Sequence, residues 1–176
     1  MKIFIAGPRA ITQLDNNVTD KLFSIYEKGH DVFVGDAAGV DTAVQRFYAD
    51  KTYNNVTVFA SNGKARNNIG NWKVENVIAD DSLKKFDFYK QKDVAMASMA
   101  DYGFMVWNGE SKGTLNNIIN LIRQKKPCLV YFTPYEKFFT IDDEDKCLKL
   151  LSLCPTSIIS IYNKLTQTPP IQIAMF

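Results

Sequence analysis

Apolar and polar residues along the first 132 positions follow two alternating patterns. Short apolar runs, rich in Val, Ile and Phe, occur at residues 2–6, 31–34, 55–60, 103–107 and 128–132. Between them lie longer segments in which apolar residues recur every three or four positions, at 17–28, 40–51, 83 or 88 to 99, and 113 to the basic turn at 123–126. The short runs predict buried strands, and the longer segments predict amphipathic helices.

This regular alternation indicates an α/β fold. A strand, a helix and a second strand form a parallel unit with a right-handed crossover, so successive helices can cover both faces of the sheet. We therefore predict a Rossmann-like, doubly wound, mainly parallel five-stranded sheet with helices on both faces and a small C-terminal extension. Residues 1–133 are the predicted Rossmann-like domain, and residues 134–176 the extension packed on it.

Two segments do not follow the alternation. Residues 61–80 are polar, rich in Asn and Gly and without a clear period, so we expect a long loop. In the extension, residues 144–153 have a helical pattern and residues 158–162 are compatible with a short strand. Four apolar residues there have no evident core role, which would suit a homo-oligomer. They are Phe138, Phe139, Ile158 and Ile159.

The composition narrows the classes of function. The 176-residue chain is 46% hydrophobic, and its 21 Lys and Arg nearly balance its 19 Asp and Glu, for a net charge of +2. Such a balance creates no overall electrostatic field that would attract nucleic acid or anionic lipid, so neither is an expected partner. No apolar run approaches the roughly 20 residues of a membrane span, and nothing resembles a signal peptide. We expect a cytoplasmic protein.

Cysteine and histidine usage argues against a metal site. Cys128, Cys147 and Cys154 lack CxxC spacing, and His30 is the single histidine. We therefore expect reduced thiols, no metal and no cofactor.

Three of the predicted strands end in sequences suited to binding a small ligand, because ligands of open parallel sheets bind outside the carboxyl ends of the strands. After the first strand, Gly7 lets the backbone approach a ligand, and Arg9, which follows Pro8, offers a planar guanidinium to a phosphate or carboxylate. The same residues also fit an ordinary tight turn with a solvated arginine, and that alternative stays open.

The second strand end is the turn GDAAGVD. Gly35 and Gly39 remove side chains on both sides of the turn, which leaves the N-terminus of the next helix accessible to an anion. Asp41 falls in the first turn of that helix, where a carboxylate can cap N–H groups or contact a ligand. Asp36 has no comparable structural role. By analogy with the acidic residue that reads ribose in dinucleotide folds, we expect Asp36 to contact the ligand.

The third strand end combines glycines, hydroxyl groups and a lysine directly before a helix, which indicates a phosphate cradle. Its candidate ligand-binding residues are Asn108, Gly109, Ser111, Lys112, Gly113 and Thr114. The segment is not a P-loop, because the order GxxxxGK[ST] is absent. The three strand ends together predict one small-ligand site at one edge of the sheet.

The blocks IAGPRA, VGDAAGVDTAVQRF and KDVAMASMADYGFMVWNGESKGTLNNII, followed by KKPCLVYF, together resemble the SLOG superfamily of Rossmann-like nucleotide-binding domains. They are most similar to its YspA-like branch. The superfamily also includes the LOG phosphoribohydrolases and the DNA-processing DprA/Smf proteins. The resemblance covers residues 1–132 and implies that the three loops bind a nucleotide or a nucleotide-derived signal. The opening IFIAGP also has a weaker similarity to nucleoside 2-deoxyribosyltransferases.

One departure from the family bears on catalysis. LOG enzymes carry PGGxGTxxE with a catalytic glutamate, whereas Asn117 occupies that position in GTLNN. Cleavage of an N-glycosidic bond needs a carboxylate, a role that an amide does not fill. The main hypothesis is therefore nucleotide binding or sensing without catalysis.

Two other hypotheses follow from the same resemblance. In one, the chain is a phosphoribohydrolase-like or deoxyribosyltransferase-like enzyme whose catalytic carboxylate is Asp36 or Asp41. In the other, it binds single-stranded DNA as DprA does. The DNA hypothesis is the least favoured, because the sequence shows no basic stripe.

Overall fold

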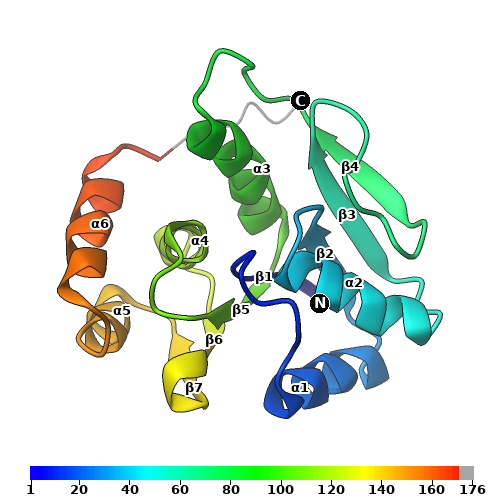
Figure 1. Cartoon of the computed structure of the whole chain (residues 1–176), viewed down its shortest axis with the longest axis horizontal. Helices are drawn as coiled ribbons and strands as arrows, with labels where there is room; N and C mark the ends of the chain where they lie inside the picture. Colours follow the sequence, from blue (N-terminus) through cyan, green and yellow to red (C-terminus); the bar gives the residue numbers. More distant parts are fainter. Residues whose placement is uncertain (171–176) are drawn as a thin grey trace.

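One seven-stranded sheet runs through the computed structural model, which describes residues 1–170 (Figure 1). Its strand order is β4-β3-β2-β1-β5-β6-β7, and all neighbours are parallel except β6 and β7. The strands are β1 (Lys2–Ala6), β2 (Asp31–Gly35), β3 (Val56–Ser61), β4 (Lys73–Val77), β5 (Tyr102–Trp107), β6 (Cys128–Phe132) and β7 (Lys137–Ile141). The Rossmann-like α/β fold is confirmed, with seven strands in place of the expected five.

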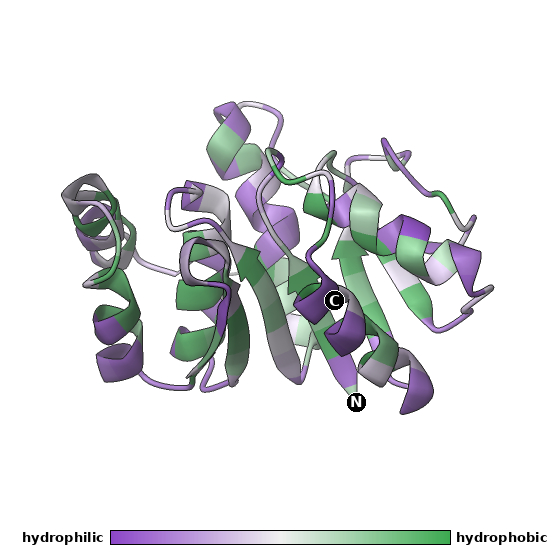
Figure 2. Cartoon of the chain, turned by 60° about the horizontal axis from the view of Figure 1, so that its bottom comes forward, coloured by the Kyte–Doolittle hydropathy of each residue, from purple (hydrophilic) through white to green (hydrophobic). Residues whose placement is uncertain are grey.

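Helices cover both faces of the sheet, because alternate residues of each buried strand point to opposite sides. Ile3 and Ile5 of β1 belong to the apolar cluster that contains buried residues of the first two helices, whereas Phe4 belongs to the cluster that contains buried residues of the other four. Figure 2 shows the apolar strands between helices whose outer sides are hydrophilic. The helices are α1 (Asn16–Glu27), α2 (Val40–Asp50), α3 (Lys85–Met99), α4 (Lys112–Arg123), α5 (Glu144–Leu151) and α6 (Thr156–Gln167). A single 3-10 turn, η1 (Thr133–Tyr135), joins β6 to β7.

The two unexpected strands lie at the edges of the sheet. β4 falls inside the expected long loop, and β7 lies in the C-terminal extension. In both strands only the last residue is fully buried, so neither has the continuous apolar run of a central strand. The predictions of one continuous loop over residues 61–80 and of five strands were therefore wrong.

The C-terminal extension contributes β7 to the sheet and packs α6 against α4. The helical pattern at 144–153 is confirmed by α5, but the short strand expected at 158–162 is wrong, because these residues belong to α6. Ile158 is buried and Phe139 packs against the core, while Phe138 and Ile159 stay partly exposed. No helix among residues 1–170 is both long and apolar enough to cross a membrane.

The strand order reverses at β1, which lies between β2 and β5. The chain leaving β1 turns to α1 on one face of the sheet, and the chain leaving β5 turns to α4 on the other (Figure 1). Divergent connections at a reversal of this kind open a crevice at the carboxyl ends of the strands, where doubly wound folds bind ligands.

Candidate functional site

A pocket of about 540 Å³ occupies this crevice. Its walls come from the loop after β1, the turns before α2 and α4, and the helix α3. The volume lies within the range of roughly 300–1,000 Å³ that is usual for small-molecule sites. Eight of the residues proposed from the sequence line it, namely Gly7, Pro8, Arg9, Asp41, Asn108, Ser111, Gly113 and Thr114. The other five lie outside the lining, namely Gly35, Asp36, Gly39, Gly109 and Lys112.

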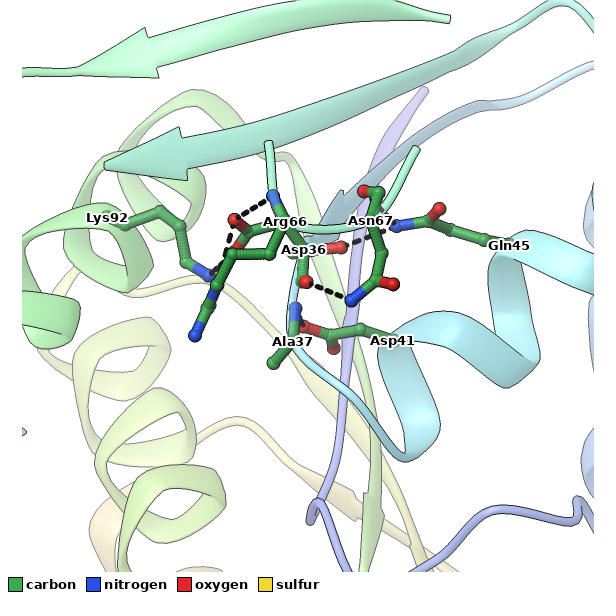
Figure 3. A network of polar contacts seen from close by, with 8 residues as sticks. Asp36, Ala37, Asp41, Gln45, Arg66, Asn67 and Lys92 are labelled. Carbon is green, nitrogen blue, oxygen red and sulfur yellow. Dashed lines mark hydrogen bonds and ion pairs between the residues drawn. The ribbon is translucent and has the colours of Figure 1, made fainter. Parts of the chain in front are cut away.

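The Asp36 side chain is engaged by two cations of the protein itself (Figure 3). Arg66 donates to the Asp36 carboxylate from its backbone N–H at 3.0 Å, from Nε at 3.1 Å and from Nη2 at 2.6 Å. Lys92 Nζ donates from 2.9 Å. Burial opposes ionisation of Asp36, yet these hydrogen bonds and the charge of Lys92 hold its pKa well below the usual range. Asp36 therefore remains ionised and bound within the protein.

The same turn is locked by amide side chains. Asn67 Nδ2 donates to the backbone carbonyl of Asp36 at 2.8 Å, and Gln45 Nε2 donates to that of Gly35 at 2.9 Å. Gln45 Oε1 accepts from the backbone N–H of Ile69 at 2.9 Å. These bonds tie the segment between β3 and β4 over the end of β2 (Figure 3).

The space beside the two glycines of the β2–α2 turn is occupied by other groups of the protein. A Cβ on Gly35 would overlap the Asp41 carboxylate and lie 3.1 Å from Lys92 Nζ. Gly39 has a φ of 86°, and a Cβ there would overlap the backbone of Arg9. These glycines permit close packing of the protein, rather than leaving the open space that the sequence suggested.

Two carboxyl groups that line the pocket have raised pKa values. Asp41 is 7% exposed and accepts a hydrogen bond from the backbone N–H of Ala37 at 3.2 Å. Burial raises the pKa of Asp41 to about 6, against the opposing charge of Lys92. Burial likewise raises the pKa of Asp93, on α3, to about 7. Both groups can therefore carry a proton near neutral pH.

The β5–α4 turn leaves polar groups open to the pocket. Asn108 Oδ1 accepts from the backbone N–H groups of Glu110 and Ser111, and Ser111 Oγ caps the N–H of Thr114 at 3.3 Å. Within residues 1–170, the backbone N–H groups of Lys112 and Gly113 have no recorded acceptor. A Cβ on Gly113 would meet no atom within 4 Å. The first turn of α4 thus presents free N–H groups beside open space.

The helix α3 adds cations and aromatic rings to the wall. Lys90 is 7% exposed and lines the pocket. The ring of Tyr89 lies 4.4 Å from the Arg66 guanidinium carbon and 5.5 Å from that of Arg9. Lys112 Nζ lies 3.9 Å from the ring centroid of Phe86. This side of the pocket is therefore positively charged and contains aromatic surface.

Several of these residues escaped the sequence analysis. Arg66 lies in an irregular segment without periodicity, so no local signal marks it. Lys92 carried a signal, because it stands three residues after Tyr89 and four before the buried Met96, on the inward face of α3. Asn117, which the sequence analysis named only for its bearing on catalysis, is buried and lines the pocket, and its Oδ1 has no partner among the described residues.

Comparisons with known proteins support the fold. No family model matches the chain, and no curated protein matches it by sequence. Among solved structures, the chain is similar to DNA processing protein A from Helicobacter pylori, described for its single-stranded DNA binding mode. The TM-score is 0.59 at 13% identity, over 95% of this chain and 80% of the other. The likeness shows a Rossmann-like fold of the DprA kind.

Proposed function

We propose that the pocket binds a nucleotide or a nucleotide-derived ligand, and that the protein is a nucleotide-binding or sensing domain of the SLOG type. The observation that carries the proposal is the open first turn of α4, where Gly113, whose N–H has no acceptor among residues 1–170, lines a pocket at the switch point of the sheet. A helix N-terminus in this position favours a phosphate group. The order of the sequence blocks shared with the SLOG superfamily supports the same assignment.

The other features of the pocket suit the remainder of a nucleotide. The Tyr89 and Phe86 rings offer surface on which a base can stack. The carboxyl groups of Asp41 and Asp93 can exchange hydrogen bonds with a sugar or a base. A ligand with a phosphate at one end and a polar ring system at the other would use all of these groups.

Thermal-shift and calorimetric titrations with nucleoside monophosphates, cyclic nucleotides and dinucleotides test the proposal. A bound ligand at about 100 times its Kd is expected to raise the Tm by about 5 °C or more. The variant Gly113→Glu places a carboxylate in the open space beside α4 and should abolish binding. Ser160→Glu, on the exposed side of α6, changes the charge equally and should bind as the wild type does. No shift with any nucleotide would overturn the proposal.

An enzymatic alternative is favoured by the position and the raised pKa of Asp41. In that alternative, Asp41 supplies the carboxylate of an N-glycosidase or deoxyribosyltransferase that Asn117 does not provide. Chromatography would detect free base released from nucleoside monophosphates, and Asp41→Asn should abolish that release. Activity that persists in Asp41→Asn would exclude this role for Asp41.

Single-stranded DNA binding is the third alternative, suggested by the DNA processing protein with the similar fold. Fluorescence anisotropy of a labelled oligonucleotide at low salt tests it, because contacts to a DNA backbone strengthen as salt falls. Binding that competes with nucleotides would place both ligands in the same pocket.

A further inference from the structure

The strand β7 (Lys137–Ile141) forms one edge of the sheet, and within residues 1–170 no strand lies beyond it (Figure 1). An edge strand presents unpaired backbone N–H and C=O groups, which proteins usually protect with charged residues, proline or a bulge. The three central residues of β7 are Phe138, Phe139 and Thr140, none of which is charged. β7 is therefore an edge with little of the usual protection.

The pairing of β5, β6 and β7 shows which backbone groups of β7 point outward. Gly103 of β5 donates from its N–H to the carbonyl of Pro127 at 3.0 Å, so the odd-numbered residues at β6 direct their backbone groups to β5. The even-numbered residues of β6 face β7, and each pairs with an odd-numbered residue there. The even-numbered residues of β7, Phe138 and Thr140, therefore direct their N–H and C=O groups away from the sheet.

The strand at the opposite edge, β4, is better protected. Asn62 donates from its N–H to the carbonyl of Val77 at 3.0 Å, so the same alternation directs the backbone groups of Val74 outward. β4 also carries an ion pair, in which Lys73 Nζ lies 3.4 Å from Glu75 Oε2. Charged side chains along an edge disfavour pairing with another strand, because they would lose water on pairing. The two edges of the sheet thus differ, and β7 is the one suited to a partner.

The side chains at this edge leave aromatic surface in contact with water. Phe138 is 39% exposed, although its ring centroid lies 5.0 Å from that of Tyr131 on β6. Tyr135, in η1 directly before the strand, is 49% exposed. Phe139 points to the other face of the sheet, where it packs with the apolar cluster that includes α5. Both faces of the edge therefore offer apolar groups to a strand that pairs with β7.

We propose that β7 is a homodimer interface, in which the β7 strands of two copies pair antiparallel about a twofold axis at Phe139. In this register Phe138 of each copy lies opposite Thr140 of the other, and the two residues exchange both of their hydrogen bonds. Every outward N–H and carbonyl group of Phe138 and Thr140 is then satisfied in both copies. A twofold axis perpendicular to the sheet also joins like faces, so the two Phe139 side chains become neighbours.

The charges at the ends of β7 favour a second copy as the partner. In the proposed register, Lys137 lies diagonally across from Asp143 of the second copy, within reach of a long side chain. Glu136 has a φ of 52° and belongs to the turn before the strand, outside the paired segment. One pair of five-residue strands buries less than the roughly 800 Å² per partner of a standard interface, so we expect a Kd of about 10–100 μM.

Sedimentation velocity of the full chain between about 5 and 500 μM tests the interface, and the wild type should shift from monomer to dimer over this range. Thr140→Pro removes an N–H that points away from the sheet, so the monomer should fold as before. Its dimer should weaken by about tenfold or more, because each copy loses a hydrogen bond at the interface. Val74→Pro is the matched control, since it makes the same change at the edge formed by β4, and it should dimerise as the wild type does.

Disulfide trapping tests the register independently. In the proposed dimer the two Cα atoms at position 139 lie about 4.5 Å apart, as in any directly opposite pair without hydrogen bonds, so Phe139→Cys should cross-link under mild oxidation. Thr140→Cys is the matched control, because its two Cα atoms would lie roughly 8 Å apart, too far for a disulfide. The wild type, with its own three cysteines, gives the background.

A wild type that stays monomeric at about 500 μM overturns the inference. A dimer that persists in Thr140→Pro, or that is lost equally in Val74→Pro, overturns it as well. If Thr140→Pro does not fold, the trapping decides. Cross-linking of Phe139→Cys without cross-linking of Thr140→Cys supports the interface, and equal or absent cross-linking overturns it. These outcomes are independent of nucleotide binding, which is tested separately.

Discussion

The β2–α2 turn and the β5–α4 turn differ in how closely the rest of the protein packs around them. Both connect a buried strand to a helix, and both contain two glycines and acidic or hydroxyl side chains. In the first, Asp36 is bound by Arg66 and Lys92, and the N–H of Val40 donates to the Pro8 carbonyl. In the second, a Cβ on Gly113 would meet no atom within 4 Å, whereas a Cβ on Gly35 or Gly39 of the first turn would overlap neighbouring groups.

This difference is the reason we assign a structural role to the first turn and propose a binding role for the second. A buried polar group must find a partner, either in the protein or in a ligand. In the β2–α2 turn, the Asp36 carboxylate is paired within the protein and both glycines are closely packed, so we expect this turn to stabilise the fold. In the β5–α4 turn, the open space at Gly113 leaves room for the ligand that we propose. The two turns should respond differently to substitution.

The largest effect should come from Asp36→Asn. Removing the charge of Asp36 takes away the hydrogen-bonded ion-pair partner of the buried Lys92, although Asp93 and Asp41 remain nearby, at an expected cost of about 3 kcal/mol in the free energy of unfolding. Urea denaturation would measure this loss. The matched control is Asp142→Asn, which removes an exposed pair with Lys146 and should change stability too little to resolve. Equal losses in the two variants would contradict a structural role for the β2–α2 turn.

Stability should also depend on pH through Asp41. Because its folded pKa of about 6 lies above the ordinary 3.8, Asp41 contributes stability that is complete below pH 3.8 and is lost as pH rises through 6. The expected loss is roughly 3 kcal/mol, and the raised pKa of Asp93 extends it toward pH 7. Asp36 has the opposite effect. Because its pKa is lowered in the folded protein, the stability that its carboxylate contributes is lost as pH falls below 3.8.

Denaturation of wild type and Asp41→Asn between pH 4 and pH 7 would measure the Asp41 contribution. In Asp41→Asn, the free energy of unfolding should fall much less between pH 4 and pH 7, because an amide does not titrate in this range. An unchanged slope would assign the pH dependence to other groups.

The smallest expected change in stability comes from replacing a glycine in each turn by alanine. Gly35→Ala should destabilise the protein by about 1–3 kcal/mol, because the new methyl group meets Asp41 and Lys92. Gly113→Ala should leave stability unchanged or raise it by up to about 1 kcal/mol, since its methyl group enters open space on a helix. Thermal melts of both variants test this contrast. A comparable loss in Gly113→Ala would show that the β5–α4 turn is packed as tightly as the other.

The predicted elements that proved correct are those whose pattern is set by burial along a continuous segment. The five central strands and the helices between them were placed this way, and so was α5. Strands β4 and β7 were missed because an edge strand has one partner and little burial, so its sequence shows no apolar run. The residues 158–162 were assigned to a strand because a short apolar run does not distinguish a strand from a helix.

The sequence by itself determined the alternation of strands and helices, the parallel sheet and the edge at which loops after β1 and β5 would meet. These follow from local periodicity and from the handedness of the connections. Only the tertiary structure decided which polar groups are paired. Asp36 lies 30 positions from Arg66 and 56 from Lys92, so no local pattern could reveal that its charge is neutralised within the protein.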